Sequence, residues 1–321
     1  MKNFLDEQLM KSRTVAITGH TRPDGDCVGS CMGLYNYIVE NYPELETDVY
    51  LESFAECYKV ISRTDEIKKP GDADKVYDLF ICLDTSQKER MTENAEKYFD
   101  QAKTRINIDH HVSNTGFADI DHVVPDASSS CEVLYDLLDD EKISLAAAEA
   151  LYIGIICDSG VFKYSSTGEH TMQVSGKLMS KGINTARLID GVFYEHTYVQ
   201  ARLLGQALLN SQLVLGGRCI YTVVDREMFA RFGAGRDDLE GIVEQLRLTK
   251  GVEVAILISE NENGAVKFSF RSKDIVDVNK VASIYNGGGH IRAAGCTVYE
   301  KYEEPLKKFL ENIEGQLAAN V

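Results

Sequence analysis

Short apolar segments alternate with helical segments in the first half of this chain, and this alternation restricts the folds open to it. The apolar segments lie at residues 14–18, 48–52, 78–83 and 104–108, and helical patterns near 27–41 and 54–61 separate the first three. Parallel strands need crossover connections of this kind, which are usually helices. We therefore predict an α/β fold whose N-terminal domain is a doubly wound, mostly parallel sheet.

Further helices are predicted after the sheet, and a second domain after them. Ser128–Ser130 and Ser144 are typical helix caps, for helices through about 139 and 156, and two more helices are expected over 169–181 and 185–193. Residues 196–212 carry leucines at helical spacing without a Pro or Gly/Ser tract, which indicates a helical linker. Strands near 219–224, 254–259 and 266–271 and helices near 237–248 and 302–317 then indicate a smaller α/β domain. The expected domains are 1–195, 196–212 (the linker) and 213–321.

Charge and composition exclude some classes of function. The formal net charge of -16 argues against sequence-independent binding to long nucleic acid, because such binding needs a broad basic surface. Residues 1–13 lack the apolar core of a signal peptide, and no run approaches the about 18 apolar residues of a membrane span. The eight cysteines contain no CxxC pair, so we expect buried reduced thiols. These features predict a cytoplasmic protein that binds neither membrane nor long duplex nucleic acid.

Polar side chains stand directly after four of the apolar segments. The groups are His20, Asp24 and Asp26; Asp84; Asp109, His110 and His111; and Asp158, which follows an apolar helix. In open parallel sheets, ligand sites form at the carboxyl ends of the strands. The alternative for each group is a structural one: a capping turn for Asp24 and Asp26, a turn or cap for Asp84, a polar loop for residues 109–111 and a simple helix end for Asp158.

Taken together, these side chains indicate a metal site. Four Asp and two or three His without a thiolate form an oxygen and imidazole donor set that suits Mn²⁺, Mg²⁺ or Co²⁺. Such sets commonly hold two ions, which together stabilise the attacking and leaving oxygens of a phosphoryl displacement. Adjacent imidazoles point in different directions, so one of His110 and His111 can bind metal while the other faces substrate. Asp109 is placed to orient an imidazole.

The ordered motifs resemble the DHH phosphoesterase superfamily, which is named for the triplet Asp109-His110-His111. In the first half they read GHTRPDGD at 19–26, LDTS at 83–86, IDHHVSN at 108–114 and CDSGVFKYSST at 157–167. The second half resembles the DHH-associated domain through FSFRSK at 268–273, DVN at 277–279, GGGH at 287–290 and AAG at 293–295. The likeness covers nearly the whole chain and is closest to the NrnA-type subgroup of oligoribonucleases and pAp phosphatases.

The resemblance implies roles for individual residues. His20, Asp24 and Asp84 would hold one metal, and Asp26, Asp84, His110 and Asp158 the other, so that Asp84 bridges the two. His111, oriented by Asp109, would face the scissile phosphate. The residues implied to grip the terminal nucleotide or phosphate are Arg271, Gly287, Gly288, Gly289 and His290.

The glycine segment can also be interpreted without the family. Three glycines let backbone N–H groups approach an anion closely, and a plain glycine-rich turn is the alternative. Asn286 stands where the subgroup often has a fourth glycine. Because Asn tolerates left-handed backbone, we expect the loop shape to survive.

The predicted function is metal-dependent hydrolysis of short oligoribonucleotides (nanoRNA) to nucleoside monophosphates, of 3'-phosphoadenosine 5'-phosphate (pAp) to AMP, or of both. The cofactors would be two divalent ions, Mn²⁺ before Mg²⁺ or Co²⁺, in an active site in the cleft between the domains. The alternatives are a cyclic di-AMP or pApA phosphodiesterase, an inorganic pyrophosphatase or exopolyphosphatase, and a non-catalytic nucleotide-binding relative. The expected partner is a short RNA or small nucleotide, and a homo-oligomer remains open.

Overall fold

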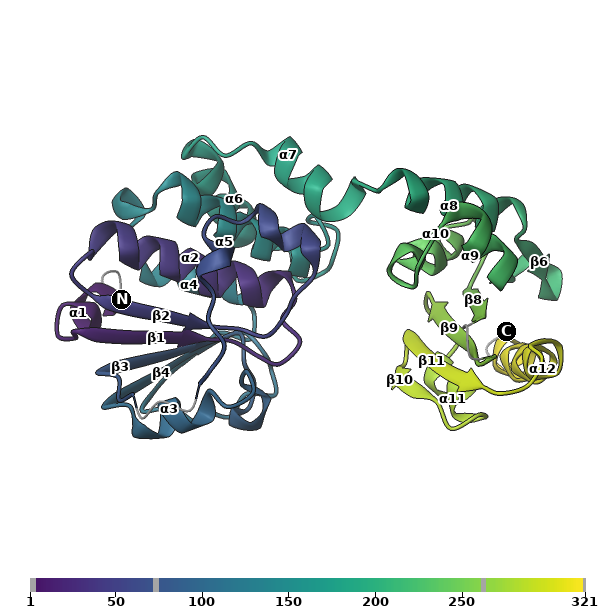
Figure 1. Ribbon diagram of the computed structural model, residues 1–321, viewed down its shortest axis with the longest axis horizontal. Helices are drawn as coiled ribbons and strands as arrows, with labels where there is room; N and C mark the ends of the chain where they lie inside the picture. The colour runs from purple at the N-terminus through teal and green to yellow at the C-terminus, as the bar shows by residue number, and fades with distance from the viewer. Residues whose placement is uncertain (1–3, 72–74, 261–263, 320–321) are drawn as a thin grey trace. The chain divides into compact units, whose positions relative to one another are not determined.

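The chain folds into two compact units, each with its own sheet and core (Figure 1). The computed structural model describes residues 4–71, 75–260 and 264–319. Unit 1 comprises Met1–Glu195 and unit 2 comprises His196–Val321. No helix in the described ranges is both long and apolar enough to cross a membrane. The prediction of two α/β units, the first with a parallel sheet, is confirmed.

The sheet of unit 1 is parallel throughout, with the strand order β2-β1-β3-β4-β5 in the described chain. The strands are β1 (Thr14–Thr18), β2 (Glu46–Tyr50), β3 (Leu79–Leu83), β4 (Thr104–Asp109) and β5 (Ile120–Val123). The sequence prediction missed β5, because this half-buried edge strand has no continuous apolar run. The strand order reverses between β1 and β3, and ligands of such sheets bind outside the carboxyl ends of the strands at this point.

Helices cover both faces of this sheet (Figure 1). The helices α2 (Gly25–Asn41), α4 (Ser130–Leu137) and α5 (Leu145–Asp158) pack on one face, and α3 (Glu96–Gln101) packs on the other. Alternate residues of β1 serve the two cores, since Val15 and Ile17 belong to the first and Ala16 to the second. The strands are therefore apolar on both sides, which is why they appear as continuous apolar runs in the sequence.

Two glycines let α2 lie directly on α5. A Cβ atom at Gly29 would lie 2.7 Å from the carbonyl oxygen of Ala150. One at Gly154 would lie 2.8 Å from Oδ1 of Asp26. The close contact thus also leaves space for a buried carboxylate at the start of α2.

Two of the other helices predicted for unit 1 are shorter than the sequence suggested. The predicted helix over 54–61 is a 3₁₀ turn at Glu56–Val60, and the one over 185–193 is a short α7 followed by a π-helical turn at Asp190–Tyr194. The remaining elements are α1 (Phe4–Leu9), α6 (Glu169–Ser180), α7 (Thr185–Ile189) and 3₁₀ turns at Thr64–Glu66, Lys88–Arg90 and Asp140–Lys142. Ser144 caps α5 as predicted, because its Oγ accepts a hydrogen bond from the Ala147 N–H.

Unit 2 contains a mixed sheet in the order β10-β11-β9-β8-β7-β6 among its described residues. Only β7 and β8 pair in parallel there. The strands are β6 (Gln212–Val214), β7 (Cys219–Val224), β8 (Val254–Glu260), β9 (Val266–Ser272), β10 (Gly288–His290) and β11 (Ala293–Val298). The prediction missed β6, β10 and β11, two of which are only three residues long.

Two helical layers enclose the sheet of unit 2. The helices α11 (Val278–Ser283) and α12 (Glu303–Ala318) contribute to one core, and α8 (Tyr198–Leu209), α9 (Arg226–Phe232) and α10 (Ile242–Arg247) contribute to the other. The predicted helix over 237–248 is broken: a 3₁₀ turn at Asp237–Leu239 precedes α10, with Gly241 between them at φ 81°.

Most of the segment 196–212, predicted to be a helical linker, forms α8, which packs within unit 2, and Gln212 already begins β6. Leu203 and Ala207 of this helix are buried against β7, β8 and α10. The helix therefore behaves as part of the second unit's core. The predicted domain limits remain a prediction.

Candidate metal centre

His20, Asp24 and Asp26 lie at the junction of β1 with α2. His20 Nε2 is 3.7 Å from Asp24 Oδ1 and 3.4 Å from Asp84 Oδ2. Asp24 is also the N-cap of α2, because its Oδ1 accepts hydrogen bonds from the backbone N–H groups of Asp26 and Cys27. The capping interpretation therefore holds for Asp24, and the capping oxygen, Oδ1, is also the one that lies 3.7 Å from His20 Nε2.

Asp84 lies between the two groups of predicted ligands. Its Oδ2 faces His20, while its Oδ1 is 3.6 Å from His110 Nε2. The residue is buried and has φ 51°, a left-handed backbone that is uncommon outside glycine. A left-handed Asp is also common at turns, so the backbone alone does not decide its role. The division of its two oxygens between His20 and His110 favours a ligand role for Asp84 over a plain turn.

The second group gathers around His110. Its Nε2 lies 3.1 Å from Asp158 Oδ2 and 3.9 Å from Asp26 Oδ2. All six predicted metal ligands therefore come together, although they are spread over residues 20–158. Ligand atoms of Asp26, His110 and Asp158 lie within 4.8 Å of one another, a spacing that can hold an ion.

A thiol also lies beside the first group. Cys27 forms a set with His20 and Asp84 in which the candidate ligand atoms are within 4.8 Å of each other. Burial raises the pKa of the Cys27 thiol well above its usual range. A thiolate suits softer metals than the carboxylates around it do, so a role for Cys27 would depend on the metal, whereas the carboxylate and imidazole donors suit Mn²⁺, Mg²⁺ or Co²⁺.

Backbone carbonyls fix the orientation of both imidazoles. His20 Nδ1 is 2.8 Å from the carbonyl oxygen of Thr21, and His110 Nδ1 is 3.3 Å from that of Ala127. A carbonyl only accepts, so Nδ1 carries the proton in each ring. Both Nε2 atoms are therefore turned toward the carboxylates, in the arrangement that metal-bound histidines commonly have.

His111 has a different environment from its neighbour. Its Nδ1 is 2.8 Å from Asp109 Oδ1, and the Asp109 carboxylate also accepts a hydrogen bond from Asn114 Nδ2 at 2.7 Å. The bond to Asp109, partly offset by burial, raises the pKa of His111. The His111 side chain is 37% exposed, compared with 16% for His110. Among the two imidazoles, His111 is thus the one that solvent and a substrate can reach.

The electrostatics of the cluster favour bound cations. Burial, together with the nearby Asp84 and Asp158, raises the pKa of Asp26 well above its usual range. Burial opposes protonation of His110, but the surrounding carboxylates outweigh it and raise the pKa of this imidazole to about 10. Several carboxylates thus compete for positive charge in a small buried volume. Divalent ions would supply that charge, and the carboxylate and imidazole donors suit Mn²⁺, Mg²⁺ or Co²⁺.

Two predicted substrate residues of unit 2 lie in one row across its sheet. Arg271 on β9 is directly opposite Ala293 on β11, which is directly opposite His290 on β10. Residues directly opposite each other share a face of the sheet. The guanidinium of Arg271 and the imidazole of His290 therefore project from the same face, separated by a small side chain.

The three glycines beside this row have different surroundings. A Cβ atom at Gly287 would lie 2.4 Å from the Gly295 carbonyl oxygen, and one at Gly289, with φ 150°, would lie 2.4 Å from the Ala293 carbonyl oxygen. A Cβ atom at Gly288 would meet nothing closer than Asn279 Oδ1 at 3.7 Å. Close packing on β11 thus explains Gly287 and Gly289. Among the three glycines, only Gly288 has open space beside its Cα atom, where a ligand could approach the backbone closely.

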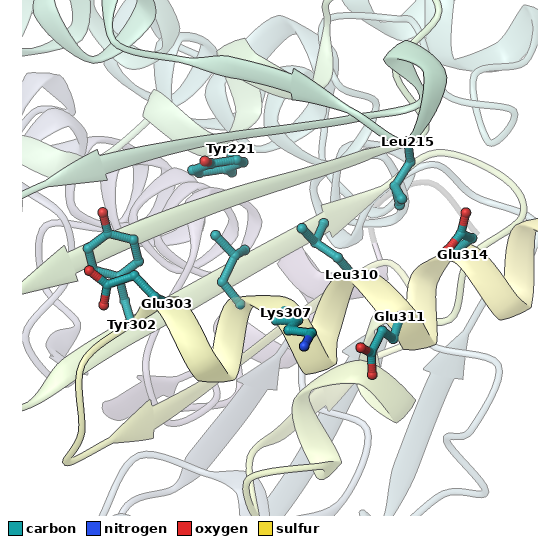
Figure 2. Close-up of a pocket in the computed structure, with 9 residues that line it drawn as sticks. Leu215, Tyr221, Tyr302, Glu303, Lys307, Leu310, Glu311 and Glu314 are labelled. Carbon is teal, nitrogen blue, oxygen red and sulfur yellow. The ribbon is translucent and has the colours of Figure 1, made fainter.

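A separate pocket in unit 2 lies beside α12. Figure 2 shows Tyr221 and Leu215 across from Tyr302 and Leu310, and the cavity measures about 380 Å³. Its remaining lining residues are Glu303, Leu306, Lys307, Glu311 and Glu314. None of these lining residues was predicted to bind substrate.

The sequence prediction missed several residues that form hydrogen bonds to the predicted site residues. Asn114 fixes Asp109, and Ser130 contacts both Asp26 and Asp84. Asn114 lies in the motif IDHHVSN at 108–114, so its place in the motif could have indicated a role in the site. For Ser130 the only signal was a serine run already explained as a helix cap.

Two known protein domains match this chain. Residues 14–155 match the N-terminal domain of the DHH family, and residues 216–319 match the DHHA1 domain. The chain belongs to the DHH family. It is therefore a hydrolase of the DHH phosphoesterase type.

Curated relatives of this DHH protein cover nearly its full length. A bifunctional oligoribonuclease and PAP phosphatase, NrnA of Bacillus subtilis, is 29% identical over 93% of this chain and 94% of its own length. The Thermus thermophilus protein with the same description is 27% identical over 93% of this chain and 90% of its own. A cyclic-di-AMP phosphodiesterase, GdpP of Geobacillus thermodenitrificans, is 27% identical over 92% of this chain but only 46% of its own length.

A solved structure shares the fold. It is the crystal structure of an exopolyphosphatase-related protein from Bacteroides fragilis, with a TM-score of 0.81 and 25% identity. The match covers 97% of this chain and 94% of that one.

Proposed function

We propose that this DHH protein hydrolyses short oligoribonucleotides to nucleoside monophosphates, pAp to AMP, or both, with two divalent metal ions. The observation that carries the proposal is the way the two oxygens of Asp84 divide between His20 and His110. A carboxylate placed in this way can bridge two ions. The length and identity of the match to oligoribonuclease and PAP phosphatase relatives support this class of substrate.

The proposed ligand sets follow the two groups of side chains. His20, Asp24 and Asp84 would hold the first ion. The second would be held by Asp26, Asp84, His110 and Asp158. When bound, divalent ions would stabilise the negative charge that develops on the attacking and leaving oxygens during phosphoryl displacement. Mn²⁺ is the proposed metal, and Mg²⁺ or Co²⁺ would also suit these sets of carboxylates and imidazoles.

His111 is the proposed catalytic side chain of unit 1. Its Nδ1 is held by Asp109, so Nε2 is the nitrogen available to a substrate. The Asp109 carboxylate stabilises the protonated imidazole, which would donate a hydrogen bond to a non-bridging phosphate oxygen. Asn114 keeps Asp109 in place through its own hydrogen bond. This arrangement lets the protein orient the phosphate and offset its charge without moving a side chain.

Unit 2 would bind the nucleotide end of the substrate. Arg271 and His290 share a face of the sheet and can each donate to a phosphate. The open backbone at Gly288 would allow a close approach beside them. That the active site lies in a cleft between the domains remains a prediction.

A direct test compares substrates in parallel. Purified protein with Mn²⁺ is incubated with pApA, a five-nucleotide RNA, pAp, cyclic di-AMP and pyrophosphate, and the products are separated by chromatography. We expect mononucleotides from the RNA or AMP from pAp, and no product after the metal is chelated. Cleavage of pyrophosphate alone would contradict the proposal and favour a pyrophosphatase.

A second candidate is a cyclic di-AMP or pApA phosphodiesterase. The observation in its favour is the match of most of this chain to part of the GdpP protein. In the same experiment, conversion of cyclic di-AMP to pApA or AMP, faster than cleavage of the RNA, would favour this candidate.

A further inference from the structure

One short segment outside the predicted site contacts three of the predicted metal ligands. The carbonyl oxygen of Ala127 accepts from His110 Nδ1 at 3.3 Å. The backbone N–H of Ser130 donates to Asp26 Oδ2 at 2.6 Å, and that of Cys131 donates to Asp26 Oδ1 at 3.0 Å. The Ser130 hydroxyl donates to Asp84 Oδ1 at 3.0 Å. Both oxygens of Asp26 and one oxygen of Asp84 are therefore held from one side.

The segment is itself firmly anchored at the start of α4. Ser129 is the N-cap, because its Oγ accepts from the backbone N–H of Glu132 at 3.1 Å. The Glu132 carboxylate in turn accepts from the Ser128 hydroxyl and, at 2.8 Å, from Thr171 Oγ1 on α6. All of these side chains are buried. The donors that face Asp26 and Asp84 are thus fixed before any ion arrives.

This arrangement has two physical effects on the carboxylates. Hydrogen bonds at fixed positions restrict the rotation of Asp26 and Asp84, so fewer orientations are lost when an ion binds. The amino end of α4 also carries partial positive charge, which reduces the repulsion between these buried acids. Both effects lower the free-energy cost of keeping a metal site ready in the absence of metal.

We propose that Ser130 is a positioning residue, whose hydroxyl holds Asp84 in the orientation that lets it bridge two ions. The inference deepens the proposed metal-dependent function and rests on it. Ser130 would not touch substrate or metal. It would act through Asp84, with its backbone N–H acting through Asp26.

The test compares Ser130→Ala with the same substitution of another serine, Ser144, which lies at the start of α5. Ser144→Ala removes the cap of α5, where Ser144 Oγ accepts from Ala147, and Ser144 contacts no predicted ligand in the described chain. Ser130→Thr keeps a hydroxyl at the first residue of α4. Mn²⁺ affinity is measured by isothermal titration calorimetry for the wild type and all three variants, and thermal unfolding of the metal-free proteins is recorded beside it.

We expect Ser130→Ala to weaken Mn²⁺ binding by about 10- to 100-fold, the range seen when a residue that supports a metal ligand is removed. Ser130→Thr should bind more tightly than Ser130→Ala. Ser144→Ala should lower the unfolding temperature while its Mn²⁺ affinity stays at the wild-type value. A purely structural role for Ser130 predicts the same pattern in both alanine variants.

Two results would overturn the inference. Unchanged Mn²⁺ affinity in Ser130→Ala is the first, and an equal loss of affinity in Ser144→Ala is the second. Either would leave the metal-dependent function standing. A wild-type protein that binds no Mn²⁺ would instead overturn the proposed function, and this inference with it.

Discussion

The candidate metal cluster of unit 1 and the glycine segment of unit 2 differ in the part of the chain that their proposed roles use, side chains in the first and backbone in the second. In the cluster, side chains converge: the two oxygens of Asp84 face His20 and His110. The Ser130 hydroxyl holds Asp84 there by a buried hydrogen bond to Oδ1. In the glycine segment, the proposed substrate binding would use the backbone, and two of the three glycines are required by packing on β11. Substitutions in the first region should therefore affect chemistry, whereas those in the second should affect either fold or substrate binding, depending on the position.

The strongest test of this difference removes the carboxylate of Asp84, the proposed ligand of both ions. Asp84→Asn keeps the shape of the side chain but lowers its affinity for cations. We expect kcat/KM to fall by at least about 100-fold, because loss of a ligand should exceed the effect of losing its supporting residues. Mn²⁺ binding, measured by calorimetry, should weaken in parallel.

A surface carboxylate serves as the control for Asp84. Asp100 pairs with Lys88 on the exposed surface, and Asp100→Asn should leave activity unchanged. Full hydrolytic activity in a correctly folded Asp84→Asn protein would remove Asp84 from the site.

The next test separates the glycines of unit 2. Gly289→Ala places a Cβ atom 2.4 Å from the Ala293 carbonyl oxygen at φ 150°, so the unfolding free energy of unit 2 should fall by about 2 kcal/mol or more. Gly288→Ala meets no atom closer than 3.7 Å and should change stability by less than about 0.5 kcal/mol. Gly288→Ala should instead raise KM for the nucleotide substrate.

Urea unfolding and steady-state kinetics on both alanine variants check this expectation. If Gly288→Ala has the wild-type KM, the open backbone there has no part in substrate binding. If both variants are equally stable, the distinction between packed and open glycines is wrong.

A third test asks whether every buried carboxylate of unit 1 belongs to the metal cluster. Asp48 on β2 pairs with Lys68 and Lys75. Burial opposes its ionisation, but hydrogen bonds from both lysines and Tyr77 outweigh this effect and lower the pKa of Asp48 to about 2. Because the folded pKa lies below the unfolded one, the stabilisation is present above about pH 4 and is lost as pH falls through about 2.

Asp48→Asn should therefore lower the unfolding free energy of unit 1 by about 2 kcal/mol at pH 7. The difference from wild type should shrink between pH 4 and pH 2, while Mn²⁺ affinity at pH 7 stays unchanged. Denaturant unfolding over this pH range measures the effect. Asp119→Asn, which removes an exposed pair with Arg105, is the control and should cost less than about 1 kcal/mol.

The smallest expected effect concerns the residue before the glycines. Asn286 has φ 53°, a left-handed backbone that glycine adopts more readily. Asn286→Gly should therefore change the unfolding free energy of unit 2 by less than about 1 kcal/mol, since relief of backbone strain is opposed by a more flexible unfolded chain. Substrate KM should stay at the wild-type value, and a rise above it would make the Asn286 side chain part of substrate binding.

The sequence predicts the residues of the candidate metal cluster better than the residues that hold them in place. The strand ends identify Asp84 and His110, because a polar residue directly after a buried parallel strand lies at the edge of the sheet where ligands bind. The role of Ser130 depends on where α4 begins in space, which a serine run cannot reveal. The glycine segment was expected to be a loop and is partly the strand β10, because glycines carry no hydrophobic period. Which of these glycines is packed depends on β11, which the prediction also missed.

The hydrogen bond between Asp26 and Ser130 also constrains how the protein reaches its active form. It joins residues 104 positions apart, so closing that loop carries a large entropic cost that only the finished sheet and helices can offset. In small zinc modules, by contrast, the ligands are close together in the sequence, and metal binding and folding occur together. Here metal uptake should be among the last events of folding, so a nascent chain ending before α4 would emerge from the ribosome unable to take up its ions.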